Sequence, residues 1–290
     1  MARVYTGAEA REYTRWLARS HYENFPVVTF LLPRRLHQDF YNVYAFCRWA
    51  DDLGDEIGNP QESLRLLEWW RGELDGMYQG RASHPVFVAL KESAARHDLP
   101  KEPFEDLIRA FVQDQTVQRY RTFEELFGYC RCSANPVGRL VLYLCGYRDA
   151  ERQALSDATC TALQLANFWQ DIVRDLEKGR VYLPLELIER HGYSVEELEA
   201  RRETPAFRAV MREAVEVARR LFLEGLPLAR LVDRRLAADL ELFSRGGMRV
   251  LEKIERQNYN VLARRPYVTR VERAWLLAGT LARMAFRRAA

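Results

Sequence analysis

Two acidic stretches carry the residues in this chain that are best suited to chemistry. The first stretch contains Asp51, Asp52 and Asp55, and the second contains Asp171 and Asp175. Residues four apart lie one above the other on an α-helix, so each stretch predicts a ladder of two carboxylates on one helical face. We call Asp51 and Asp55 the first ladder, and Asp171 and Asp175 the second ladder.

The helical phase predicts that both ladders continue partly apolar strips and face inward. The first strip runs through Phe40, Tyr44, Cys47, Asp51 and Asp55, and the second through Cys160, Gln164, Asn167, Asp171 and Asp175. Two unit charges about 6 Å apart oppose each other by roughly 3 kcal/mol at an effective dielectric of about 20, so a cation must compensate. Carboxylate and amide oxygens suit Mg²⁺, which bridges one or two carboxylates to phosphate oxygens. Two facing ladders with Mg²⁺ between them predict a phosphorylated substrate, and a diphosphate fits best.

The alternative is a pair of solvated acidic faces, because surface helices often carry motifs such as Asp-Asp-x-x-Asp. One ladder alone would favour that interpretation. A second ladder that also carries Gln164 and Asn167 favours the metal site.

Basic and aromatic residues around the ladders suggest how a diphosphate substrate would be held. Guanidinium groups bind phosphate oxygens in bidentate geometry, which makes arginines beside the ladders candidates, although each alone is explained as well by a surface ion pair. These arginines are Arg48, Arg174 and Arg265. Ser20 and His21 end a predicted helix, where a cap or core role is as plausible for His21 as phosphate contact. Tyrosines and phenylalanines pack by default, but an aromatic face also stabilises a carbocation.

Helical periodicity extends along the whole chain, and no alternating run of β-branched residues predicts a sheet. We therefore expect an all-α protein with a single domain over 1–290. The capping motifs Thr6-x-x-Glu9 and Thr122-x-x-Glu125 open two of its helices. The expected helices cover about 6–21, 34–57, 61–79, 84–97, 102–119, 122–147 with a kink at Pro136, 150–177, 204–243 with a bend at Pro227, 244–263 and 269–287, with two short pieces after Pro184.

Composition excludes several classes of function. The net charge is only +3, and basic residues alternate with acidic ones, so no nucleic-acid partner is expected. Five cysteines without disulfide or zinc spacing suit reduced thiols, and the start of the chain has no apolar signal segment, so we expect a cytoplasmic protein. The run 274–286 is too short to span a bilayer, but Arg283, Arg287 and Arg288 suggest peripheral membrane contact. Dinucleotide, P-loop and zinc-hydrolase motifs do not occur.

At three blocks of residues the sequence resembles the squalene and phytoene synthase family over roughly 10–285. The blocks are Tyr44-Ala45-Phe46-Cys47-Arg48 leading into Asp51-Asp52-x-x-Asp55, then Leu126-Phe127-Gly128-Tyr129-Cys130, and finally Gln164-Leu165-x-Asn167-x-x-x-Asp171-Ile172-x-x-Asp175 followed by Gly179-Arg180-Val181-Tyr182-Leu183-Pro184. The resemblance implies a helical bundle of the isoprenoid synthase type around a central cavity. It implies Mg²⁺ as the cofactor and a prenyl diphosphate as the substrate.

The resemblance also implies roles for individual residues. The metal ligands would be Asp51, Asp55, Asn167, Asp171 and Asp175, and the catalytic residues would be the four ladder aspartates with Tyr129 near the departing diphosphate. The substrate would contact Ser20, His21, Arg48, Gln164, Arg174, Tyr182, Tyr259 and Arg265.

A departure in the second block points to one branch of the family. The stretch Arg131-Cys132-Ser133-Ala134-Asn135-Pro136 replaces a more common Tyr-x-Val-Ala-Gly pattern, and His21-Tyr22-Glu23-Asn24-Phe25-Pro26 precedes it. Both look like the bacterial hopanoid-pathway branch, which converts presqualene diphosphate to hydroxysqualene. Two alternatives stay open: condensation of two farnesyl diphosphates to presqualene diphosphate or squalene, and a non-catalytic helical lipid-binding scaffold.

Overall fold

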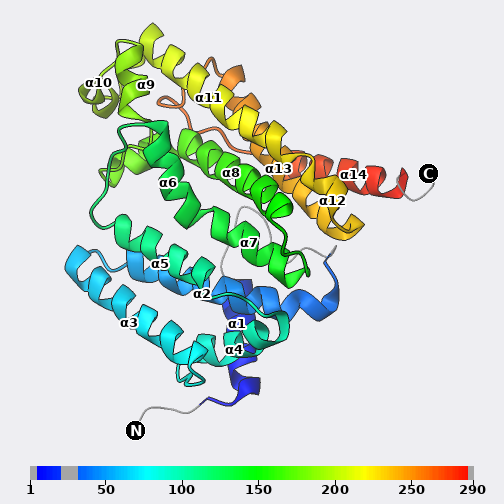
Figure 1. The fold of residues 1–290 in the computed structure, drawn as a ribbon. Coiled ribbons are helices and arrows are strands. Elements are labelled where there is room, and N and C mark those ends of the chain that lie inside the picture. The colour runs from blue at the N-terminus through cyan, green and yellow to red at the C-terminus, as the bar shows by residue number, and fades with distance from the viewer. Residues whose placement is uncertain (1–4, 21–31, 287–290) are drawn as a thin grey trace. The chain divides into compact units, whose positions relative to one another are not determined.

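The computed structural model describes residues 5–20 and 32–286, and these residues form an all-α fold (Figure 1). Within them, the only β pairing is an isolated bridge between Arg119 and Val181. The expected fold class is confirmed. The helices are α1 (Gly7–Ser20), a 3₁₀ turn η1 (Arg34–Leu36), α2 (His37–Asp55), α3 (Pro60–Tyr78), α4 (Pro85–His97), α5 (Glu102–Gln113), α6 (Phe123–Ser133), α7 (Asn135–Leu144), α8 (Ala150–Glu177), α9 (Leu185–Arg190), α10 (Val195–Glu199), α11 (Pro205–Gly225), α12 (Leu228–Leu231), α13 (Arg234–Arg256) and α14 (Arg270–Phe286).

Contacts between residues divide the chain into two compact units. Unit 1 comprises Met1–Thr116 and Pro136–Gln153, and unit 2 comprises Val117–Asn135 and Ala154–Ala290. The first ladder belongs to unit 1 and the second ladder to unit 2. The expectation of one domain over 1–290 stays a prediction.

Helix starts follow the capping chemistry of the sequence. The Thr6 hydroxyl accepts a hydrogen bond from the Glu9 backbone N–H at 3.3 Å, while the Glu9 carboxylate accepts one from the Thr6 N–H at 2.9 Å. Thr122 caps α6 by accepting from the Glu125 N–H at 3.2 Å, while the Glu125 carboxylate accepts from the Arg121 N–H at 2.6 Å. Both predicted capping motifs are confirmed. Asn59 caps α3 with a proline in the first turn, where its missing N–H costs nothing.

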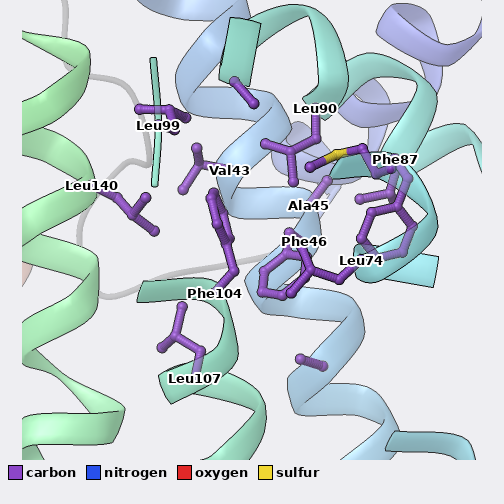
Figure 2. Packing of buried hydrophobic residues seen from close by; sticks show 14 of the residues in the cluster. Val43, Ala45, Phe46, Leu74, Phe87, Leu90, Leu99, Phe104, Leu107 and Leu140 are labelled. Carbon is purple, nitrogen blue, oxygen red and sulfur yellow. The ribbon is translucent and has the colours of Figure 1, made fainter. Parts of the chain in front are cut away.

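Unit 1 is organised around the apolar faces of α2, α3, α4 and α5 (Figure 2). Phe46 of α2 is fully buried, with its ring 4.9 Å from Phe104, 5.9 Å from Phe87 and 5.7 Å from Trp70. The first two pairs are edge-to-face, a geometry that suits the quadrupoles of aromatic rings. This aromatic core fixes the rotation of α2 and therefore the direction in which its C-terminal aspartates point.

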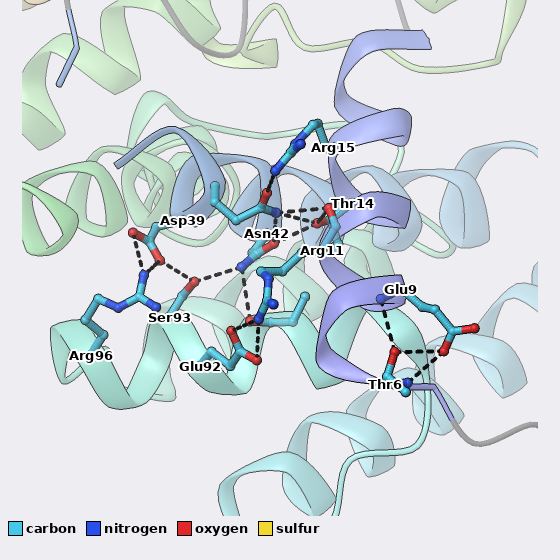
Figure 3. Close-up of polar contacts among 12 residues, drawn as sticks. Thr6, Glu9, Arg11, Thr14, Arg15, Asp39, Asn42, Glu92, Ser93 and Arg96 are labelled. Atoms are coloured by element: carbon cyan, nitrogen blue, oxygen red, sulfur yellow. Dashed lines mark hydrogen bonds and ion pairs between the residues drawn. The ribbon is translucent and has the colours of Figure 1, made fainter. Parts of the chain in front are cut away.

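A buried polar network links α1, α2 and α4 (Figure 3). Thr14 donates to the Asn42 side-chain oxygen at 2.7 Å, and the Asn42 amide donates to Ser93 at 2.9 Å. Ser93 in turn donates to Asp39 at 2.7 Å, and Arg96 donates to the same carboxylate at 2.9 Å. Asp39 is almost fully buried, so its charge is tolerated because these donors replace water.

Unit 2 packs α11 and α13 closely against neighbouring helices. A Cβ added to Gly225 of α11 would lie 2.0 Å from the Thr159 hydroxyl oxygen of α8, so only glycine permits this approach of the two helices. Trp169 of α8 is buried and donates its indole N–H to the Ala214 carbonyl of α11 at 3.0 Å. These contacts hold the helix that carries the second ladder.

Several expected helix boundaries were wrong. The segment 122–147 forms two helices, α6 and α7, instead of one kinked helix, because Pro136 can begin a helix but cannot donate within one. The expected helix over 102–119 ends at Gln113.

The expected helix over 204–243 is divided into α11, α12 and the start of α13, and the expected break near 243 does not occur because α13 runs through it. Helix α13 begins at Arg234 and ends at Arg256. The carboxylate of its N-cap residue, Asp233, accepts hydrogen bonds from the N–H groups of Arg235 and Leu236 at 2.9 and 3.3 Å.

Candidate functional site

The first ladder lies in the last turns of α2, as its spacing predicted. Asp51 has 43% of its side chain exposed, so it is less enclosed than an inward-facing carboxylate would be. Arg48 lies one turn earlier and makes ion pairs with Asp52 and, at 3.1 Å, with Asp51. Burial of Arg48 opposes its charge, but the hydrogen bond with Asp52 and both aspartate charges raise the pKa of the guanidinium overall.

The second ladder lies in the C-terminal half of α8, and its first carboxylate is well enclosed. Only 12% of the Asp171 side chain is exposed. Arg265, which is 94 residues away in sequence, forms a bidentate pair with it: Nε donates to one oxygen and Nη2 donates to the other at 2.9 Å. This hydrogen bond with Asp171 raises the pKa of the Arg265 guanidinium. The ion pair with Arg174 is looser, at 3.7 Å, and most of Arg174 is exposed.

Gln170 fixes the segment that carries Arg265. Its side chain is buried, and its amide donates to the Pro266 backbone carbonyl at 2.6 Å. Since Gln170 precedes Asp171 on α8 and Pro266 follows Arg265, this bond holds the two members of the ion pair together. Sequence reasoning missed Gln170, because it lies outside the ladder strip and nothing local indicates its partner.

The end of α8 directs the chain back toward the second ladder. Gly179 has a φ of +74°, its N–H donates to the Leu176 carbonyl at 2.9 Å, and the Arg180 N–H donates to the Asp175 carbonyl at 2.8 Å. This pair of bonds is the Schellman motif, which ends a helix at a left-handed glycine. The following residues then pair with the segment before α6, where the Val181 N–H donates to the Gln118 carbonyl at 2.8 Å.

The turn at Gly179 places Tyr182 in an aromatic cluster beside the second ladder. Tyr182 stacks on Phe168 of α8 with ring centroids 3.7 Å apart and planes 8° apart. Tyr129 lies 6.0 Å from Tyr182 and 6.2 Å from Phe168, and Tyr120 lies 5.9 Å from Tyr182. We call these four residues the aromatic cluster. The sequence singled out Tyr129 and Tyr182, treated Phe168 as packing and missed Tyr120, which has no motif of its own.

A small pocket joins this cluster to the second ladder. It is lined by Phe168, Ile172, Asp175, Leu176, Arg180, Val181, Tyr182, Leu183 and Leu198. Its wall therefore combines apolar and aromatic surface with the carboxylate of Asp175 and the guanidinium of Arg180. Arg180 belongs to the third sequence block, but nothing in the sequence gave it a role.

The remaining predicted site residues are placed as follows. Gln164 is half-buried on α8 and Asn167 is exposed on the same helix. The Ser20 hydroxyl donates to the Leu17 carbonyl of its own helix at 3.1 Å. Tyr259 follows α13 in a left-handed turn with a φ of +63°, and its ring lies 5.4 Å from the guanidinium carbon of Arg212. His21 lies outside the described residues.

The oxygen donors of the two ladders fit Mg²⁺. In the described part of the chain, no group of three or more His, Cys, Asp or Glu side chains is gathered to hold a metal. Each ladder by itself offers two carboxylates, and Mg²⁺ commonly takes only one or two, completing its shell with water and phosphate oxygens. Asp171 already binds a cation in the form of the Arg265 guanidinium, which shows that this enclosed carboxylate requires a positive partner.

Comparison with known proteins gives consistent results. The family model described as squalene/phytoene synthase matches residues 18–272. A phytoene synthase from Thermus thermophilus is 36% identical, with 89% of this chain and 88% of the relative covered. A hydroxysqualene synthase from Rhodopseudomonas palustris is 32% identical, with 80% of each covered. The crystal structure of squalene synthase HpnC from Alicyclobacillus acidocaldarius is 48% identical, has a TM-score of 0.83 and covers 87% of this chain and 95% of that chain.

Proposed function

Because the chain belongs to the squalene/phytoene synthase family, an enzyme family of isoprenoid biosynthesis with an all-α fold, we propose that it converts presqualene diphosphate to hydroxysqualene with Mg²⁺. The observation that carries this proposal is the enclosed Asp171–Arg265 pair next to the aromatic cluster. It combines groups for an anionic diphosphate with an apolar surface for a cation. The hydroxysqualene synthase among the relatives supports the choice of substrate.

The residues divide into two tasks in this proposal. The four ladder aspartates and Asn167 would hold Mg²⁺, and Mg²⁺ bound there neutralises charge on the leaving diphosphate. Arg265, Arg48, Arg174 and Gln164 would bind the diphosphate oxygens, with Ser20 and His21 completing the set. Arg265 is the strongest of these, because its planar fork is already oriented by Asp171.

The reaction then consists of one ionisation and one hydration. The carbon–oxygen bond to the diphosphate breaks, and the diphosphate leaves with the electron pair. The cyclopropylcarbinyl cation rearranges as its ring opens, water adds to the cation, and a proton is lost to solvent. Tyr129, Tyr182 and Phe168 offer the negative faces of their rings to the cation, and Tyr259 would line the substrate. No reductant is consumed.

The setting that we propose is the cytoplasm with contact at a membrane surface. No helix in the described residues is long and apolar enough to cross a bilayer. None of the five cysteines forms a disulfide in the described residues, which agrees with a reducing compartment. A C30 substrate and product partition into lipid, so a synthase that touches the membrane would exchange them there.

The second candidate is condensation of two farnesyl diphosphates to presqualene diphosphate or squalene. It is favoured by the squalene synthase of known structure, which is 48% identical, and by the phytoene synthases, which are as similar as the hydroxysqualene synthases. Both candidates need the ladders, so ladder variants do not separate them. The substrate does.

Product analysis tests the proposal directly. The purified protein is incubated with Mg²⁺ and presqualene diphosphate without reductant, and the lipid extract is analysed by mass spectrometry. We expect hydroxysqualene and inorganic diphosphate. Turnover of farnesyl diphosphate alone, with no turnover of presqualene diphosphate, would replace the first candidate with the second.

Matched variants distinguish an enzyme from a helical lipid-binding scaffold. Asp51→Asn and Asp171→Asn each remove one ladder charge, and we expect kcat to fall at least about 100-fold because the lost interaction acts on charge that develops during ionisation. Glu177→Gln is the control: Glu177 is an exposed residue at the end of the same helix as Asp171, paired with Arg201. No turnover in the wild type or in any of the three variants, together with diphosphate binding that the ladder variants leave unchanged, would make the scaffold the better interpretation.

A further inference from the structure

The last helix presents an apolar stripe to solvent. Val271 is 66% exposed and Trp275 is 74% exposed, the largest values among the bulky apolar side chains of the described residues. Tyr267, just before the helix, is 49% exposed, and Leu281 is 37% exposed. Exposed alanines fill the positions between them, namely Ala274, Ala278 and Ala282. We call these seven residues the α14 stripe.

The stripe is continuous, because its six members within α14 share one face of the helix and Tyr267 lies just before it. At about 100° per residue, positions 271, 274, 275, 278, 281 and 282 fall within an arc of about 120°. The opposite side of α14 packs on α13, where Thr280 is 1% exposed. Leu276 and Leu277 flank that buried side. A surface helix normally carries polar residues on its outer arc, so the apolar outer arc of α14 marks a contact surface.

The helix is firmly held where it begins, so the stripe is a fixed surface. Glu272 accepts from the Thr269 N–H at 2.8 Å, and its own N–H donates to the Thr269 hydroxyl at 3.2 Å. The same carboxylate pairs with Arg249 at 2.8 Å and with Lys253 at 2.9 Å, both from α13. The only acidic residue of this helix is therefore already neutralised by two cations.

Exposed positive charge lies beside the start of the stripe. Residues 264–286 contain five arginines and one glutamate, and Arg287 and Arg288 lie outside the described residues. Arg265 pairs with Asp171 and Arg283 pairs with Glu241, whereas Arg264 and Arg270 are exposed beside the start of the stripe. A partner that is apolar within and anionic near this end of the helix therefore complements the surface.

We propose that the α14 stripe docks the protein on an anionic lipid bilayer, with Trp275 and Val271 inserted at the headgroup boundary and the arginines on lipid phosphates. Tryptophan and tyrosine favour that boundary, and each arginine near an anionic surface adds attraction. A second copy of the chain fits poorly, because a two-fold pairing of α14 offers Arg270 no unpaired acidic residue of the same helix: Glu272 is already paired with Arg249 and Lys253. The proposal does not depend on which reaction the enzyme catalyses.

Vesicle binding of the full chain tests this. The probe is sedimentation with vesicles of phosphatidylcholine containing about one third phosphatidylglycerol, compared with pure phosphatidylcholine. We expect binding to the anionic vesicles that weakens as salt is added. Val271→Ser combined with Trp275→Ser should reduce it at least tenfold, and Arg270→Gln should reduce it about fivefold. Binding that is equal for wild type and the double variant would overturn the proposal.

A control variant and three further measurements exclude other occupants. Trp16→Ser is the matched control, because Trp16 is an exposed tryptophan of α1 with 59% exposure, and it should bind vesicles as the wild type does. Brominated lipids should quench wild-type tryptophan fluorescence, and this quenching should disappear in Trp275→Ser.

A dimer in sedimentation velocity that the Val271/Trp275 variant abolishes would assign the stripe to a second copy. An unfolding temperature lowered by several degrees in Trp275→Ser would show that the ring is packed within the protein, and would also refute docking.

Discussion

At the scale of single residues, Asp171 shows how an enclosed carboxylate obtains hydrogen-bond partners for both of its oxygens. With 12% of its side chain exposed, it loses most of its hydration, and Arg265 replaces water on both oxygens. The pair is useful for a diphosphate site because Arg265 can exchange Asp171 for a phosphate oxygen, and Asp171 can exchange Arg265 for a metal cation. A guanidinium can move to phosphate only if a cation takes its place on the aspartate.

Gln170 should act as a positioning residue for this pair. Gln170→Met keeps the volume but leaves the buried Pro266 carbonyl without its donor, which should lower the free energy of unfolding by about 1–3 kcal/mol. Urea denaturation measures the loss. Gln153→Met is the control, because the Gln153 amide bonds at a more exposed site to Tyr143 and the Arg148 carbonyl, and less should be lost. Equal losses in the two variants would contradict the role of Gln170.

His84 should make the protein sensitive to mild acid. It caps α4 through the Val86 N–H and lies 4.6 Å from the ring of Trp49 and 5.1 Å from that of Trp70. Burial lowers its pKa to about 4, although the charge of Glu73 opposes this shift. In the unfolded chain His84 binds a proton near its ordinary pKa of about 6.5, whereas in the folded protein it stays neutral down to about pH 4. The contribution of neutral His84 to the free energy of unfolding is therefore full above about pH 6.5 and decreases as the pH falls toward about 4.

The comparison variant for this prediction is His84→Asn, since asparagine keeps a capping oxygen but does not titrate. Unfolding free energies of both proteins are measured between pH 7 and pH 4. We expect the wild type to lose more stability across that window than the variant, whatever their difference at pH 7. If the free energy of unfolding fell equally with pH in both proteins, folding would not lower the pKa of His84.

At the scale of elements, the C-terminal end of α8 determines the geometry of the second half-site. The Schellman motif stops the helix two turns after Asp171, and the returning chain brings Tyr182 onto Phe168. A longer helix would carry Arg180 and Tyr182 away from the pocket that they line with Asp175. Helix termination is therefore part of the site.

Gly179→Ala should destabilise the protein by about 1–2 kcal/mol, because alanine is strained in the left-handed region. Thermal or urea unfolding measures this loss. Gly72→Ala offers a control of opposite sign, since Gly72 lies within α3 with nothing near its added Cβ, and alanine should stabilise a helix there by about 0.5–1 kcal/mol. A neutral Gly179→Ala variant would show that this turn relaxes at no cost.

At the scale of the whole molecule, each compact unit carries one ladder. The first ladder rests on the aromatic core of unit 1, and the second on the packing of α8 with α11 in unit 2. The expectation that both ladders act on one diphosphate joins the two units and stays a prediction. Ligand-linked stability tests it without measuring turnover.

Mg²⁺ together with inorganic diphosphate should raise the unfolding temperature. A ligand at about 100 times its Kd stabilises the native state by about 2.7 kcal/mol, which is about 4 °C for a chain of this length. Asp51→Asn and Asp171→Asn should each abolish most of the shift, whereas Asp98→Asn, at a residue whose side chain is 96% exposed, should retain it. A shift that depends on Asp171 but not on Asp51 would show that the second ladder binds diphosphate alone.

The sequence alone determined the all-α class, the two carboxylate ladders, the capping motifs of α1 and α6 and the family, because helical period and capping are local properties read over a few residues. It could not reveal the contacts between distant segments. Arg265 forms an ion pair with Asp171, 94 residues away in sequence, and Gln170 donates a hydrogen bond to the Pro266 carbonyl. Tyr182 stacks on Phe168. Those partners are chosen by how helices pack and where α8 ends. The α14 stripe is a further example. The apolar composition of the helix is visible in the sequence, but only the tertiary structure shows which side of the helix faces solvent.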